Sequence, residues 1–94
     1  MMRWVTLTNK RGLHARAATR LVQEAAQFSA QLTLLRPAQN DAPEKQADLR
    51  NIMSLLMLAA PCGSELQLIA EGDDAENALD HLEALIHNRF DEDE

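Results

Sequence analysis

Gly12-Leu13-His14-Ala15-Arg16-Ala17-Ala18 joins a run of strand-forming residues to a run with helical periodicity. The segment therefore places an imidazole and an arginine where a helix is predicted to begin. Unpaired backbone N–H groups and the positive end of the helix dipole attract anions at such a point. His14 offers a nucleophilic ring nitrogen when it is neutral, and Arg16 offers a fork of donors suited to phosphate oxygens. The pattern favours a site that holds a phosphoryl group transiently.

The residues on either side of this segment predict a strand and a helix. Residues 3–8 are rich in β-branched and aromatic side chains and are predicted to form a strand, and residues 9–12 a polar turn. From Arg16 onward, apolar residues recur every three or four positions, which predicts a helix with one buried face. The positions expected on that face are Ala18, Leu21, Val22, Ala25 and Phe28.

The second half of the chain predicts three more strands and two more helices. Residues 31–36 and 65–71 are predicted to be strands, and residues 44–47 a short return strand. Asp48 is expected to cap a short helix that runs through Met57. Asp73 and Glu76 resemble a capping box at the start of a final helix. The inward stripe of this helix is expected to be Ala75, Ala78, Leu79, Leu82, Leu85 and Ile86.

This order of elements predicts a single α+β domain over residues 1–90. We expect a four-stranded, mostly antiparallel sheet with three helices on one face, the middle helix lying nearer an edge. A chain of 94 residues is long enough for one hydrophobic core but not for two. Residues 91–94 are all acidic and follow a helix C-terminus, where they oppose the dipole, so we expect an acidic, solvated tail.

Composition and charge exclude several classes of function. A net charge of -6 argues against a nucleic-acid binder, because phosphate contacts need clustered Lys and Arg. Cys62 is the only cysteine, so no intrachain disulfide is possible and a cytoplasmic location is favoured. No apolar run long enough to span a membrane is present. Cys62 and the histidines show no metal-ligand spacing, so no metal or cofactor is expected, and His81 and His87 are expected on the polar side of the last helix.

The middle helix is unusually apolar. Its residues Ile52, Met53, Leu55, Leu56, Met57 and Leu58 exceed what one face of a short helix can bury. Either the helix is deeply packed, or two or three of these side chains form an exposed patch. An exposed patch would mark a partner site, and methionine suits binding to several partners.

Three motifs together resemble the histidine-containing phosphocarrier protein (HPr) family. Gly12-Leu13-His14-Ala15-Arg16 is similar to its active-site segment, Arg50-Asn51-Ile52-Met53-Ser54-Leu55 to its second helix, and Ala70-Glu71-Gly72-Asp73-Asp74 to its last strand and helix start. The motifs occur in the family's order, and the resemblance covers nearly the whole chain. It implies an open-faced β-sandwich, which agrees with the element order predicted from the residues.

The resemblance also implies a function. His14 would take a phosphoryl group on its Nδ1 atom from an enzyme I-type donor and pass it to an enzyme IIA-type acceptor, while Arg16 neutralises charge on the transferring group. The protein would be a monomeric carrier and not a stand-alone enzyme. The residues expected to contact protein partners are Thr19, Arg20, Asn51, Ile52, Met53 and Leu56. The substitution Ile52→Glu is expected to weaken phosphotransfer and to leave the thermal midpoint of the fold nearly unchanged.

The chain departs from the family pattern at three places. Ala17 replaces the usual proline, at an expected cost of about 1 kcal/mol or less in chain entropy. Asn51 stands where many relatives carry a regulatory serine, so phosphorylation by a serine kinase cannot occur at that position. The loop at residues 37–43 is longer than usual, and we have no functional account of it.

The branch of the family can also be interpreted. Leu55-Leu56-Met57-Leu58 and Phe90-Asp91-Glu92-Asp93 are similar to the nitrogen-related branch, in which the phosphate chain regulates metabolism and does not import sugar. A sugar-system carrier is the alternative. A second alternative is a non-catalytic regulatory module that binds partners through Ile52, Met53 and Leu56; the presence of both His14 and Arg16 argues against it.

Overall fold

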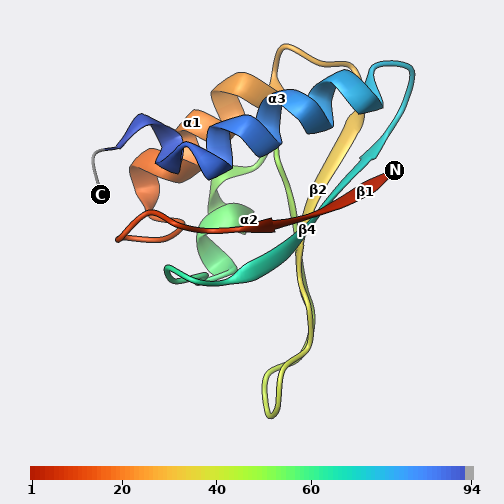
Figure 1. Ribbon diagram of the computed structural model, residues 1–94. Coiled ribbons are helices and arrows are strands. Elements are labelled where there is room, and N and C mark those ends of the chain that lie inside the picture. Colours follow the sequence, from red (N-terminus) through yellow and green to blue (C-terminus); the bar gives the residue numbers. More distant parts are fainter. Residues whose placement is uncertain (93–94) are drawn as a thin grey trace.

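The computed structural model describes residues 1–92 and shows three helices packed on one side of a sheet (Figure 1). The elements are β1 (Met2–Thr6), α1 (Ala15–Ala25), β2 (Gln31–Arg36), β3 (Lys45–Asp48), α2 (Ile52–Met57), β4 (Glu65–Glu71), α3 (Ala75–His87) and a final 3-10 turn, η1 (Arg89–Asp91). The predicted order of strands and helices is confirmed. The bounds of β2 and β4 agree with the sequence prediction to the residue.

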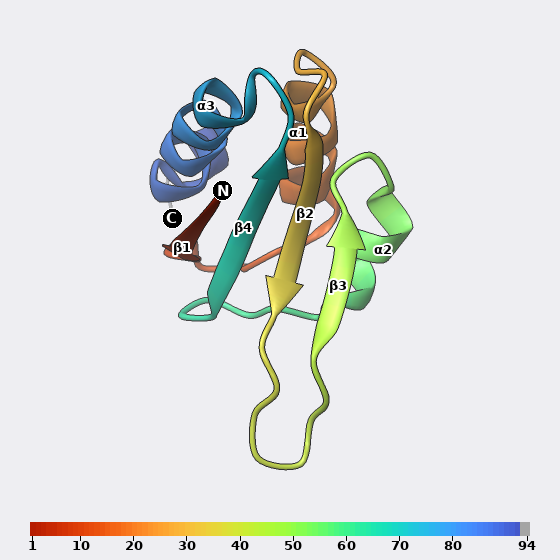
Figure 2. The same cartoon turned by 90° about the vertical axis from the view of Figure 1, so that its right-hand side faces the viewer.

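The four strands form one antiparallel sheet in the order β1-β4-β2-β3. Figure 2 shows this order, with the helices behind the sheet and α2 beside the edge strand β3. The β2–β3 hairpin extends beyond the rest of the molecule, and an isolated bridge between Gln39 and Ala42 closes its tip. The predicted α+β fold, an open-faced β-sandwich, is confirmed.

The core lies between the sheet and the helices. One face of β2 and β4 is fully buried through Leu32, Leu34, Leu66, Leu68 and Ala70. All six residues predicted for the inward stripe of the last helix are buried. On α1, the predicted Ala18, Leu21 and Ala25 are buried, whereas Val22 and Phe28 are half-buried at the margin of the core. Helical and strand periodicity were therefore reliable guides to the buried faces.

The prediction that Asp48 caps the middle helix is wrong. The helix begins at Ile52, and the cap is Asn51, whose side chain accepts a hydrogen bond of 3.1 Å from the backbone N–H of Ser54. Asp48 instead accepts a hydrogen bond from the N–H of Arg50, within the turn before the helix. Asp and Asn both cap helices well. Asp48 is still the last residue of β3, so the helix can begin only after it, and Asn51 becomes the cap.

The predicted capping box at the last helix is also wrong. Asp74, not Asp73, is the N-cap of α3, and its side chain makes no capping bond. Its carboxylate accepts hydrogen bonds from the N–H groups of Ser29 and Ala30, both at 2.8 Å. The carboxylate is therefore used to join two distant segments of the chain and not to stabilise the end of its own helix.

The expectation of a solvated tail is wrong for Glu92, whose side chain is largely buried, whereas Asp91 is exposed but paired. Asp91 pairs with Arg20 at 2.7 Å, and Glu92 lies 2.8 Å from the His14 ring. Figure 1 shows the coloured segment that follows α3 beside the start of α1. Residues 93–94 lie outside the described part of the chain.

Candidate functional site

His14 is the N-cap of α1. Its backbone is extended, with φ -91° and ψ -178°, and its carbonyl accepts the first helical hydrogen bond from the N–H of Ala18 at 2.8 Å. Its ring folds back over the helix end, where Nδ1 accepts from the N–H of Arg16 at 3.3 Å. A histidine thus takes the place that Ser, Asp or Asn normally occupies at a helix start. The arrangement brings a ring nitrogen directly to the anion-binding end of the helix.

The loop before His14 is held against the loop that follows α2. The N–H of Leu13 donates to the carbonyl of Ala60 at 2.9 Å. Asn9 is fully buried, and its Nδ2 donates to the carbonyl of Gly12 at 2.7 Å. The Oδ1 of Asn9 has no partner within residues 1–92, so the burial of this amide carries a cost that its donated bonds must offset.

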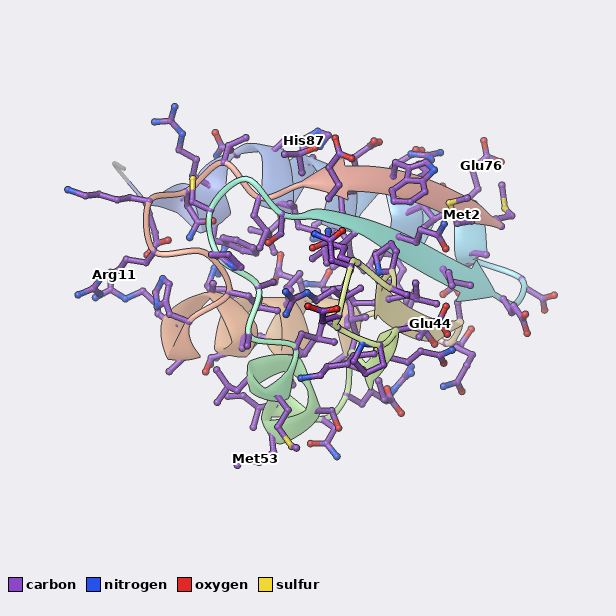
Figure 3. All side chains as sticks on the ribbon, turned by 90° about the horizontal axis from the view of Figure 1, so that it is seen from below. Met2, Arg11, Glu44, Met53, Glu76 and His87 are labelled. Atoms are coloured by element: carbon purple, nitrogen blue, oxygen red, sulfur yellow. The ribbon has the colours of Figure 1, made fainter. Side chains whose placement is uncertain are left out.

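The start of α1 suits an anion. The first turn of α1 contains no acidic residue, and helix geometry leaves the N–H groups of Ala15, Arg16 and Ala17 without intrahelical acceptors. Arg16 is exposed, and its guanidinium makes no hydrogen bond or ion pair within residues 1–92. The exposed Arg11 lies at the same end of the molecule in Figure 3. Arg16 is therefore available to close on phosphate oxygens brought by another molecule.

A carboxylate that sequence reasoning missed lies on the other side of the ring. The Nε2 atom of His14 is 2.8 Å from Oε2 of Glu92. The second oxygen, Oε1, accepts from Nδ2 of Asn9 at 2.9 Å. His14 and Glu92 are 78 residues apart, and no local pattern in the sequence signals such a contact. Asn9 was assigned only to a polar turn, and its complete burial becomes visible only in the folded chain.

The expected partner-binding residues lie on α1 and α2, which pack against one another. Thr19 and Arg20 are on the next turn of α1 after Arg16. The Thr19 hydroxyl donates to the Ala15 carbonyl at 2.8 Å, and Arg20 is occupied by Asp91. Asn51 is exposed at the start of α2. The expected residues thus lie on or at the start of two helices that contact each other, and the guanidinium of Arg20 is already paired.

The apolar residues of α2 divide between core and surface. Leu55 and Leu58 are buried, and Ile52 and Leu56 are half-buried against the core. Met53 and Met57 are 63% and 70% exposed and form what we call the α2 methionine patch. Figure 3 shows Met53 projecting away from the molecule. An exposed patch is therefore present on this helix.

The half-buried position of Ile52 changes one expectation. Because this side chain packs against the core, a glutamate there would disturb the packing of α2 as well as any docking surface. The exposed Met53 is the better probe of a partner contact.

His81 and His87 are exposed, as predicted. His81 pairs with Glu24 at 2.8 Å and thereby joins α3 to α1. Within residues 1–92, no group of three or more His, Cys, Asp or Glu side chains is placed to hold a metal ion. None of the helices described in the structure is long and apolar enough to cross a membrane.

The chain is similar to known proteins along nearly its whole length. Residues 2–88 match the family model described as the PTS HPr component phosphorylation site. The chain is 42% identical over 90 residues to the phosphocarrier protein NPr of Shewanella violacea, covering 96% of this chain and 92% of that protein. It is 43% identical over 94 residues to the phosphocarrier protein HPr of Cupriavidus necator, covering 100% and 99%.

Solved structures give the same result. The crystal structure of HPr from Thermoanaerobacter tengcongensis matches with a TM-score of 0.85 at 35% identity, covering 100% of this chain and 99% of that one. The fold and a histidine placed at a helix start define a phosphocarrier protein. This chain belongs to the HPr family of the phosphotransferase system.

Proposed function

We propose that this protein accepts a phosphoryl group on Nδ1 of His14 from an enzyme I-type protein and passes it to an enzyme IIA-type protein in the cytoplasm. The observation that carries the proposal is the position of His14 as the N-cap of α1, where its Nδ1 atom faces the backbone N–H of Arg16. The bond from Arg16 N–H to Nδ1 is long, at 3.3 Å, and is therefore weak enough to be exchanged for a bond to phosphorus.

The chemistry needs little beyond position and charge. Nδ1 attacks phosphorus, a new N–P bond forms, and the donor's bond to phosphorus breaks with its electron pair returning to the donor. The N–H of Arg16, released from Nδ1, can then donate to a phosphoryl oxygen together with the N–H of Ala17. The Arg16 guanidinium neutralises charge spread over the remaining oxygens. Reversal of the same step delivers the group to the acceptor.

The test is labelling with an enzyme I protein, its radioactive phosphodonor and Mg²⁺. Wild-type protein is expected to take up label that is acid-labile and base-stable, as befits a phosphorylated ring nitrogen. His14→Ala is expected to take up none, whereas His87→Ala, which removes an exposed histidine of α3, should label normally. A wild type that stays unlabelled with every enzyme I paralogue of its cell would end the proposal.

The regulatory nitrogen-related system is the branch that we favour over the sugar system. The similarity of residues 55–58 and 90–93 to that branch supports this, as does the NPr name of one relative, although other relatives of comparable identity are named HPr. Phosphorylated protein should therefore transfer to a nitrogen-type enzyme IIA faster than to a sugar-type one. Faster transfer to the sugar-type acceptor would assign the protein to the other branch.

A further inference from the structure

The carboxylate of Glu92 is built into the site. Its Oε2 atom is 2.8 Å from His14 Nε2, and its Oε1 atom is fixed by Asn9 at 2.9 Å. The side chains of His14 and Glu92 are only 20% and 11% exposed, so water competes weakly for this contact. Asn9 also holds the carbonyl of Gly12, which ties the carboxylate to the loop that carries His14.

The chain turns sharply to bring Glu92 to this place. Arg89, Phe90 and Asp91 have φ values of 57°, 55° and 65°, in the left-handed region that side chains other than glycine rarely adopt. The turn is held by burial of Phe90, which is 2% exposed, and by the pairing of Asp91 with Arg20 at 2.7 Å. Strain of this kind persists where surrounding contacts over-determine it, and it occurs often at functional sites.

The two ring contacts together fix the position of the proton. Nδ1 accepts from the N–H of Arg16, so in a neutral ring the proton is on Nε2 and points at Glu92. This tautomer leaves Nδ1 with a free electron pair, which is the form that can attack phosphorus. A carboxylate that holds the far nitrogen of a reactive histidine also offsets the positive charge that the ring gains during reaction.

We propose that Glu92 is a positioning residue for phosphotransfer: it holds the Nε2–H of His14, keeps Nδ1 aimed at the donor, and stabilises the ring as the N–P bond forms. The inference rests on the proposed phosphorylation of His14. The Nε2 proton stays in its hydrogen bond throughout, while one N–P bond forms at Nδ1 and the donor's bond breaks. The carboxylate lies across the ring from Nδ1, so it does not occupy the path of the incoming group.

The experiment compares Glu92→Ala and Glu92→Gln with a matched control, Glu76→Ala. Glu76 is an exposed residue in the first turn of α3, and its removal changes the net charge by the same amount as the loss of Glu92. Each protein is phosphorylated by phospho-enzyme I and, separately, by phosphoramidate, a small donor that needs no docking surface. Nitrogen-15 NMR of the His14 ring reports the tautomer and the exchange of the Nε2 proton.

Glu92→Ala is expected to react about ten- to a hundredfold more slowly with both donors, the loss typical of one hydrogen bond to a charged group. Its Nε2 proton should exchange faster with water. Glu92→Gln keeps one oxygen that can accept the Nε2–H but turns its NH2 group toward the donating Nδ2 of Asn9, so it should recover only part of the rate and of the proton protection. Glu76→Ala should match the wild type in both measurements.

Several outcomes would overturn the inference. Equal or faster reaction of Glu92→Ala with both donors would show that the carboxylate is a bystander or a block. A loss confined to phospho-enzyme I would make Glu92 a docking residue. If enzyme I leaves the wild type unlabelled, the carrier function itself fails, but the reaction with phosphoramidate still decides whether Glu92 positions His14.

Discussion

Gly12 determines how closely the His14 loop approaches its neighbour. Its φ is 66°, and a Cβ atom built on it would lie 2.5 Å from the carbonyl oxygen of Ala60 and 2.8 Å from Pro61. Both contacts are with backbone, which cannot rotate away as a side chain can. Only glycine fits this position, and the adjacent hydrogen bond from Leu13 to Ala60 depends on that fit.

Gly12→Ala is expected to lower the free energy of unfolding by about 2–3 kcal/mol, from backbone strain plus the displaced contact. Gly63→Ala is the matched control, because Gly63 also has a positive φ, of 92°, but a Cβ there meets nothing within 4 Å. Urea unfolding gives the loss of unfolding free energy for each variant. The loss at Gly63 reports backbone strain alone, and any further loss at Gly12 reports the contact of the added Cβ with Ala60 and Pro61. Equal losses would show that the approach of Gly12 to Ala60 does not contribute to stability.

The residues of the site differ in how far the sequence reveals them. The position of His14 and Arg16 at a helix start was predictable because it depends on a local feature, a helical pattern that begins after a glycine. Glu92 was not, because its contact depends on the length of α3 and on three left-handed residues that reverse the chain. Residues 91–94 were expected to form a solvated tail because acidic residues after a helix C-terminus oppose its dipole. The fold instead supplies Arg20 and His14 as partners for Asp91 and Glu92.

At the scale of elements, α2 is the helix that carries exposed large apolar side chains. It is only six residues long, with Leu55 buried within it. It packs on β3 and α1 and leaves the α2 methionine patch exposed. The patch lies on the helix next to the one that begins at His14. We therefore expect a protein that docks on α1 to contact this patch.

Met53→Glu is expected to raise the donor concentration needed for half-maximal phosphorylation by about tenfold, because a charge would be buried against the partner. The thermal midpoint should not change, since Met53 is 63% exposed. Met2→Glu is the control: Met2 is 46% exposed and lies on β1, at a distance from Met53 in Figure 3. Unchanged phosphorylation of Met53→Glu would show that partners do not use the patch.

The elements themselves were predictable to different degrees. Strands β2 and β4 have strong apolar patterns bounded by turns, and their limits were predicted correctly. β3 is a polar edge strand that exists because β2 pairs with it, and its sequence, Lys45–Asp48, indicated it only weakly. The caps of α2 and α3 were wrongly assigned because each helix is preceded by two residues able to cap it, and tertiary contacts choose between them.

At the scale of the whole molecule, Asp74 joins segments that are far apart in the chain. Its carboxylate bridges the start of α3 to Ser29 and Ala30, which lead into β2. Hydrogen bonds from the N–H of Ser29, and then from that of Ala30, hold the pKa of Asp74 below its ordinary value, against the opposing effect of desolvation. The charged form of this carboxylate is therefore the one that the folded state favours.

The lowered pKa of Asp74 predicts how stability depends on pH. A group whose pKa is lower in the folded state stabilises the fold at pH values above its unfolded pKa, about 4, and the contribution is lost as the pH falls through the folded value. Asp74→Asn should therefore be less stable than the wild type at neutral pH, and the difference should shrink in acid. Urea unfolding at neutral and at strongly acidic pH measures this difference in the free energy of unfolding between the wild type and the variant.

Asp73→Asn provides the charge-matched comparison, because Asp73 is exposed and accepts no hydrogen bond within residues 1–92. It should change stability little at either pH, since a lone surface charge contributes little. If Asp74→Asn loses the same free energy of unfolding in acid as at neutral pH, the bridge depends on the shape of the side chain and not on its charge. A difference that disappears in acid would instead show that one ionised carboxylate helps to hold the start of α3 against the segment that leads into β2.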